Sequence, residues 1–146
     1  MSYILWIDYE KPEIADMTKH LGSDPRVHIT LQPVFALAVD YLSQNKDRIR
    51  SLPQSSIFQI ICRGYYASEN KNAMDLLPFL EHYQLKDVPI IVITGNKSAV
   101  LDHFKRQALS MGNQDWKSRI HVTSYHAELI TKINSNLVDK CAQHRH

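Results

Sequence analysis

Five short runs of apolar residues, rich in the types that favour strands, recur along the chain between longer segments of mixed polarity. They occupy residues 4–7, 27–31, 57–62, 88–93 and 119–123. In the second run, Val27, Ile29 and Leu31 alternate with polar residues. Continuous apolar runs such as residues 4–7 are typical of strands covered on both faces. Alternation of such strands with helices predicts an α/β fold with a single five-stranded parallel sheet and helices on both faces. Right-handed crossovers would make the sheet doubly wound.

The segments between these runs place apolar residues three and four positions apart, as amphipathic helices do. They occupy residues 12–21, 35–50, 74–83, 97–111 and 126–142. Pro12 and Pro78 suit a first helical turn, and Gly112 suits a helix end. We therefore expect one domain over residues 1–142 and a frayed tail at 143–146.

The composition is that of an ordinary globular domain. Of the 146 residues, 44% are hydrophobic and 22% are charged, which is enough apolar material for a buried core. A formal net charge of +2 without long runs of one sign indicates neither a nucleic acid nor a membrane as partner. The N-terminus lacks the pattern of a signal peptide, and no apolar stretch approaches the roughly 18 residues of a membrane span. Cys62 and Cys141 are too few for a disulfide framework or a zinc set, so we expect a reduced, cytoplasmic protein without cofactors.

The candidate site follows from the direction of the strands. In open parallel sheets, ligands bind beyond the carboxyl ends of the strands. The residues that follow the first, third, fourth and fifth runs are Asp8, Tyr9 and Glu10, then Cys62 to Tyr65, then Thr94 to Asn96, and finally Thr123 to Tyr125.

Three segments resemble the receiver domains of two-component response regulators. Residues 4–8, followed by Pro12, are similar to the first strand and acidic turn of that family, and residues 75–80, Asp-Leu-Leu-Pro-Phe-Leu, are similar to its third helix. Residues 88–95, Val-Pro-Ile-Ile-Val-Ile-Thr-Gly, resemble its fourth strand with the terminal hydroxyl residue. The resemblance extends over nearly the whole chain and implies a (βα)5 fold of the flavodoxin and receiver type.

The resemblance also implies a set of site residues, of which this chain retains a part. A working receiver has a phosphoacceptor aspartate at the end of the third strand, two acids after the first strand that hold Mg²⁺, a hydroxyl residue after the fourth strand and a lysine after the fifth. Asp8 matches the first acid and Thr94 matches the hydroxyl residue. Tyr9 stands in place of the second acid, with Glu10 displaced by one position, and Thr123 stands where the lysine is expected.

No carboxylate closes the third strand of this chain. The candidates for that position are Cys62, Arg63, Gly64 and Tyr65, and the next acid, Glu69, lies too far along the loop. Transfer of a phosphoryl group to a carboxylate requires that oxygen beside a metal ion that offsets the phosphate charge. The resemblance therefore implies a pseudo-receiver that signals without phosphorylation and is not an enzyme.

Arg63 is the most informative substitution in this crevice. Its guanidinium could pair with Asp8 and Glu10, could bind an anion, or could remain a solvated loop residue. Asp8 and Glu10 could likewise hold a cation, although two acids without a third oxygen ligand more often form a solvated turn. The eight histidines are scattered without a metal-ligand spacing, so we expect no metal site.

The contact surface of receivers lies on the fourth helix, the fifth strand and the last helix, which implies residues 97–142 here. Aromatic and basic side chains of the kind enriched at interfaces occur in this range. Our candidates for contact with a protein partner or with a second copy of the chain are Lys105, Trp116 and Tyr125. The alternative is that Phe104 is a core residue and that Trp116 covers the connection at 112–118.

Two other functions remain open on the same fold. A TIR-like nucleotide hydrolase shares the five-stranded parallel plan and uses a glutamate, for which Glu69 and Glu81 are candidates. An atypical receiver could use another acid as its phosphoacceptor. A dinucleotide or P-loop site is disfavoured because no glycine-rich loop follows the first strand. Tyr65 and Tyr66 could form a contact site near the crevice or cover the core.

Overall fold

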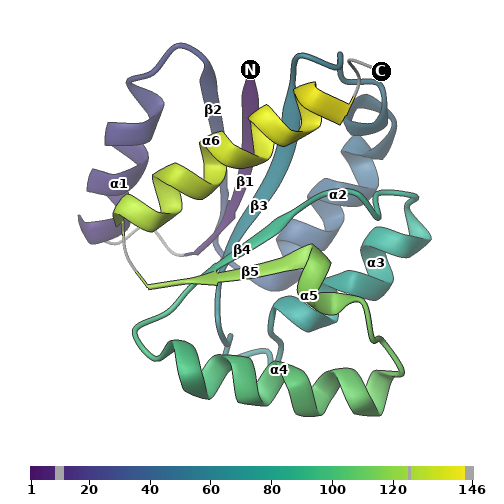
Figure 1. Ribbon diagram of the computed structural model, residues 1–146. Helices are drawn as coiled ribbons and strands as arrows, with labels where there is room; N and C mark the ends of the chain where they lie inside the picture. Colours follow the sequence, from purple (N-terminus) through teal and green to yellow (C-terminus); the bar gives the residue numbers. More distant parts are fainter. Residues whose placement is uncertain (9–11, 125, 144–146) are drawn as a thin grey trace.

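The sheet has the predicted architecture. The computed structural model describes residues 1–8, 12–124 and 126–143. Within these ranges the strands form one sheet in which every neighbouring pair is parallel (Figure 1). The strands are β1 (Ser2–Ile7), β2 (Val27–Gln32), β3 (Ile57–Arg63), β4 (Ile90–Ile93) and β5 (Ile120–Thr123). Their order, β2-β1-β3-β4-β5, confirms a doubly wound α/β fold of the flavodoxin type.

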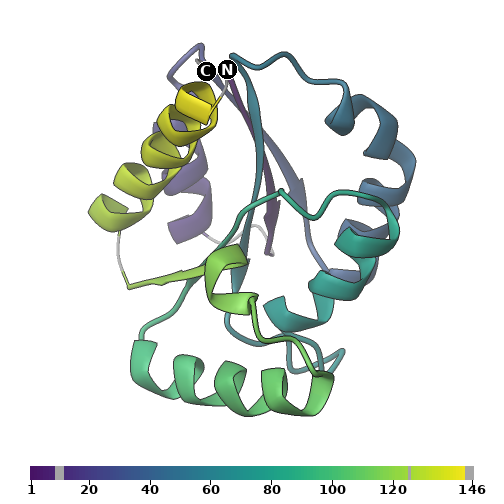
Figure 2. The same ribbon diagram turned by 45° about the vertical axis from the view of Figure 1, so that its right-hand side comes forward.

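Helices cover both faces of this sheet. Those in the described ranges are α1 (Pro12–Gly22), α2 (Phe35–Arg50), the 3-10 turn η1 (Ala73–Leu76), α3 (Leu77–His82), α4 (Lys97–Met111), α5 (Trp116–Arg119) and α6 (His126–Gln143). Figure 2 shows α1 and α6 on one side of the sheet and α2 and α3 on the other. α4 forms the lower edge of the molecule in both views and packs against β5 and η1.

β1 shows why a central strand is apolar at consecutive positions. Successive side chains of a strand point to opposite faces of the sheet. Ile4 and Trp6 belong to the core beneath α1 and α6, whereas Leu5 and Ile7 belong to the core on the side of α2, α3 and α4. All four side chains are at most 1% exposed, and burial of each contributes about 1.5–3 kcal/mol.

The start of α3 and the end of α4 agree with the positions of Pro78 and Gly112. Pro78 lies in the first turn of α3, where its missing amide proton costs no helical hydrogen bond. Gly112 follows α4 with a φ of 67°, in the left-handed region that favours glycine. The last helix includes Gln143, the first residue of the segment expected to fray, and residues 144–146 lie outside the described residues.

Three details differ from the prediction. The helix expected at 74–83 is divided into η1 and α3, because Asn72 and Asp75 form a capping box that starts a 3-10 turn. β4 begins at Ile90, two residues after the expected start. α5 was not predicted, because four residues are too few to show a helical periodicity.

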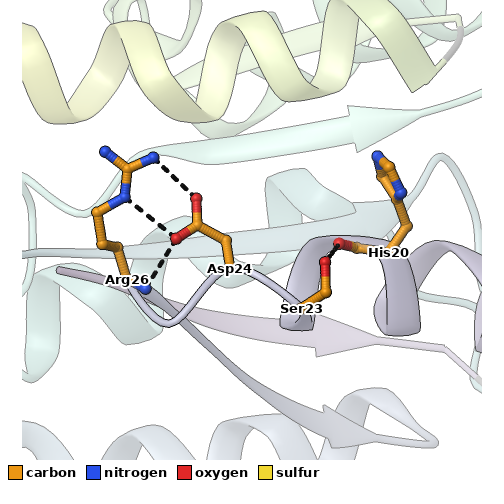
Figure 3. A network of polar contacts seen from close by, with 4 residues as sticks. All are labelled: His20, Ser23, Asp24 and Arg26. Carbon is orange, nitrogen blue, oxygen red and sulfur yellow. Dashed lines mark hydrogen bonds and ion pairs between the residues drawn. The ribbon is translucent and has the colours of Figure 1, made fainter.

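A tight turn links α1 to the edge strand β2 (Figure 3). The Ser23 hydroxyl donates a hydrogen bond of 2.7 Å to the carbonyl oxygen of His20 at the end of α1. Asp24 accepts hydrogen bonds from the backbone amide of Arg26 at 2.9 Å and from Nε and Nη2 of its guanidinium at 3.1 and 2.9 Å. These hydrogen bonds from Arg26, with its positive charge, hold the pKa of Asp24 at about 2, against an ordinary value of 3.8.

We expect the Asp24 carboxylate to remain ionised at pH 3 and to lose its charge only as the pH falls through about 2. A depressed pKa stabilises the folded chain above the ordinary pKa, and that contribution is lost as the pH falls through the folded pKa. Arg26→Gln removes the guanidinium, so the NMR titration midpoint of the Asp24 carboxyl carbon should rise toward 3.8. Lys19→Gln is the matched control and should leave the midpoint in place. An unchanged midpoint in Arg26→Gln would show that Arg26 does not cause the shift.

Candidate functional site

Asp8 and Arg63 meet at the carboxyl edge of the sheet. Ile7 pairs with Cys62 in the register of β1 and β3, so the next residues of both strands lie opposite each other. Nη1 of Arg63 lies 3.6 Å from Oδ1 of Asp8. The Asp8 side chain is 7% exposed and that of Arg63 is 40% exposed. Of the three roles considered for Arg63, the structure therefore supports the ion pair with Asp8.

Tyr66 joins the same two strand ends. Its hydroxyl donates a hydrogen bond of 2.6 Å to the carbonyl oxygen of Ile7 and accepts one of 2.9 Å from the backbone amide of Arg63. The guanidinium carbon of Arg63 lies 6.0 Å from the centre of the Tyr66 ring, a cation–π distance. Burial raises the pKa of Tyr66 far above its usual range, so the phenol keeps the proton that it donates. Tyr66 thus covers the core, whereas Tyr65 is 49% exposed.

The loop after β3 is also fastened to α2. Both oxygens of Glu69 accept hydrogen bonds from the first amides of that helix, from Phe35 at 2.7 Å and from Ala36 at 3.0 Å. Val34 stands at the N-cap of α2 and offers no side-chain oxygen, so Glu69 supplies the missing cap from another segment. Glu81, the other acid considered for a hydrolase, pairs with Nη1 of Arg119 at 2.7 Å. Both glutamates therefore have structural partners.

The two threonines of the predicted site have different surroundings. Thr94 is half-buried after β4, and its hydroxyl accepts a hydrogen bond of 3.1 Å from the Asn96 amide. Thr123 is fully buried, and its hydroxyl donates to the carbonyl oxygen of Val92 at 3.5 Å. Thr94 is thus accessible at the sheet edge and Thr123 is not. Tyr9 and Glu10 lie outside the described residues.

A groove of about 1080 Å³ opens beside the ion pair, between the loop after β3 and α4. We call it the α4 groove. Arg63, Thr94 and Tyr65, which the sequence analysis singled out, line it. It is also lined by residues that the analysis missed, which include Asn70, Asn72, Asp75, His103, Arg106 and Gln107. One sequence pattern could have indicated them: His103, Arg106 and Gln107 are spaced to lie on one face of a predicted helix.

Of the predicted contact residues, Lys105 is exposed on α4. Trp116 is buried, so the expectation that it is a surface contact is wrong, whereas the alternative expectation that Phe104 is a core residue is confirmed. The Trp116 side chain is 4% exposed, and its ring packs edge-on against fully buried Phe104 with centroids 6.0 Å apart. The short helix α5 turns this indole inward, where burial of a large aromatic ring is most favourable. Tyr125 lies outside the described residues.

Other candidate chemistry receives little support from the described residues. Burial raises the pKa of the Cys62 thiol, and its side chain packs in the core as a small apolar group. Within residues 1–8, 12–124 and 126–143, no three His, Cys, Asp or Glu side chains are grouped to hold a metal ion. None of the helices in these ranges combines the length and apolar character needed to cross a membrane.

Comparison with known proteins does not extend the assignment. No family model matches the chain, and no curated protein is significantly similar to it in sequence. Membership of the receiver family therefore stays a prediction, since many functions occur on the doubly wound fold.

We expect Asp8 and Arg63 to be energetically coupled. In a double-mutant cycle of Asp8→Ala and Arg63→Ala, followed by denaturant unfolding, the coupling free energy should be on the order of 0.5–3 kcal/mol. The partly exposed guanidinium places the expected value in the lower half of that range, because solvent screens the pair.

The chain offers a matched control for this cycle. Nζ of Lys86 lies 3.6 Å from Oδ2 of Asp115, the same separation as in the pair of Asp8 and Arg63. The Lys86 side chain is 62% exposed and that of Asp115 is 50% exposed, so this pair lies on the surface. Their coupling should be about 0.2–1 kcal/mol, as for ordinary surface pairs. Strict additivity at Asp8 and Arg63, or a coupling below that of the control pair, would contradict the assignment.

Proposed function

We propose that this chain is a receiver-like signalling module that acts by protein–protein contact and does not depend on phosphorylation. Its contact surface lies on α4, β5 and α6, and the occupant is a protein partner or a second copy of the chain. The proposal is supported by the receiver-like motifs, by the sheet topology and by the side chains at the sheet edge and on α4.

The sheet edge supports the part of the proposal that concerns phosphorylation. β3 ends in Arg63, and the cation of Arg63 faces Asp8, which stands where a receiver holds its first metal-binding acid. A phosphoryl group added at this position would need a nucleophilic carboxylate, and β3 provides a guanidinium instead. The resting pair also leaves Asp8 close to a positive charge that competes with a metal cation. Any signal must then come from a surface that is already formed.

The outer face of α4 is the observation that carries the proposal. Only Phe104 and Ala108 of this helix are buried. Leu101, Lys105 and Leu109 recur at intervals of four residues and therefore form one stripe on the exposed side. Leu109 is 76% exposed and Leu101 is 36% exposed, and exposed leucines beside a cation are suited to the centre of a protein contact.

The electrostatic surroundings favour a partner that is acidic as well as apolar. His121 lies on β5, and its side chain is exposed. Partial burial lowers the pKa of His121, and the positive charges of Lys132 on α6 and Lys97 on α4 lower it further. Lysines of α4 and α6 thus lie near β5 together with one acid, Glu128 of α6. Acidic groups on a partner that face these lysines would speed association and fix its orientation.

The test compares binding by single-residue variants of the intact chain. Leu109→Ser and Lys105→Ala should each weaken partner capture from the source cell, or self-association in sedimentation equilibrium, by about tenfold or more. The melting temperature should change little, because both side chains are exposed.

Leu37→Ser serves as the matched control. Leu37 is 44% exposed on α2, on the opposite side of the sheet from α6, so its loss should leave binding intact. The proposal is wrong if binding survives both α4 variants, or if Leu37→Ser weakens it to the same extent.

A further inference from the structure

The α4 groove lies on a different face of α4 from the contact stripe. Ala99, His103, Arg106 and Ser110 line the groove and follow one another at intervals of three and four residues. The contact stripe at Leu101, Lys105 and Leu109 follows a separate line along the helix. Phe104 and Ala108 anchor the helix between the two faces. The groove is therefore available for a function of its own.

The walls of the groove are held in place without a ligand. The Asn72 side chain donates to Oε1 of Gln107 at 2.7 Å, and Nε2 of Gln107 donates to Oδ1 of Asp75 at 3.2 Å. These bonds fasten α4 to η1. On the other side, a Cβ at Gly64 would lie 2.9 Å from a methyl group of Val100, so the loop approaches α4 as closely as glycine permits. A site whose walls are fixed in advance loses little entropy when a ligand binds.

The charges in the groove favour an anion. Arg106 contributes a cation, Arg63 contributes a second cation that already pairs with Asp8, and His103 contributes a ring nitrogen. The single acid in the described lining is Asp75, and both of its oxygens already accept hydrogen bonds, from Gln107 and from the Asn72 amide. Within the described residues, Arg106 has neither an ion-pair nor a hydrogen-bond partner in the protein, so its planar fork is free to bind a phosphate.

An aromatic platform lies at the same groove. Tyr65 lines it with a side chain that is 49% exposed. The Tyr65 hydroxyl donates to Oδ1 of Asn70 at 2.8 Å, which holds the ring against the loop. Exposed rings that are fixed in this way stack on flat aromatic ligands.

The remaining lining is polar but uncharged. Thr94 and Ser110 offer hydroxyl groups, and Asn70 offers an amide. These neutral donors and acceptors can form hydrogen bonds with sugar hydroxyls and with the edge of a base. The volume of about 1080 Å³ slightly exceeds the usual range for small-ligand sites, about 300–1000 Å³.

We propose that the α4 groove is a nucleotide-binding site, with the phosphate on Arg106, the sugar among the uncharged polar groups, and the base on Tyr65. The site lies at the carboxyl edge of a parallel sheet, where such folds bind ligands. It is independent of the protein contact proposed above, since it uses the other exposed face of α4. No covalent step is involved, and the nucleotide acts as a bound ligand.

The test titrates the intact chain with AMP, GMP, UMP and ATP, followed by amide NMR shifts and calorimetry. At least one nucleotide should bind saturably, with a Kd of about 1 mM or lower. The matching nucleoside and inorganic phosphate should each bind at least about tenfold more weakly, because each retains only part of the contacts.

Two variants and one control locate the site. Arg106→Gln should weaken nucleotide binding about tenfold or more through loss of a charge-assisted contact. Tyr65→Leu should weaken nucleotide binding and leave phosphate binding unchanged. Lys105→Gln removes an equal charge from the neighbouring position, outside the groove, and should change the Kd less than about twofold.

The proposal is overturned if no nucleotide binds by about 10 mM, or if phosphate alone binds as tightly as the nucleotide. It is also overturned if Lys105→Gln weakens binding as much as Arg106→Gln, which would indicate attraction by net charge alone. The two proposals can fail separately. If Lys105→Ala weakens the protein contact but leaves nucleotide binding normal, the contact surface and the nucleotide site are distinct.

Discussion

The Tyr66 hydroxyl is the interaction on which the arrangement of the sheet edge depends. It bonds to the last carbonyl of β1 and to the last amide of β3, so both strands end in fixed positions. The ring supports the guanidinium of Arg63 from one side, while Asp8 attracts it from another. Loss of that hydroxyl would remove both hydrogen bonds, each of which contributes about 0.5–1.5 kcal/mol. At the ends of β1 and β3, the protein's own side chains thus bind one another.

The α4 groove lies beside these strand ends, between the loop after β3 and α4. The loop after β3 begins at the Tyr66 contacts, is fastened to α2 by Glu69, and reaches η1 through the capping box of Asn72. α4 then packs on η1 through Gln107 and on the core through Phe104. These attachments leave two separate exposed faces on one helix, and they are the basis of the two proposals, the contact stripe and the nucleotide groove.

Much of the fold could be predicted because strands buried on both faces of a parallel sheet are apolar at consecutive positions. A surface helix, in contrast, is apolar on one face only. The pairing of Asp8 with Arg63 was also within reach, since both residues end neighbouring strands. The role of Glu69 was not, because it caps a helix that begins 34 residues earlier in the chain. Trp116 was misassigned because its residue type is enriched at interfaces, and composition does not reveal which way a four-residue helix turns its side chain. The groove depends on how the loop packs against α4, which no local pattern encodes.

The most direct test of the account is the intact mass of the protein after incubation with acetyl phosphate and Mg²⁺. Within the described residues, β3 ends in Arg63, which pairs with Asp8, and no carboxylate stands at the end of β3, so the mass should remain unchanged. A gain of one phosphoryl group that is lost at alkaline pH would identify an acyl phosphate on a carboxylate. That result would contradict the central claim that this module signals without phosphorylation.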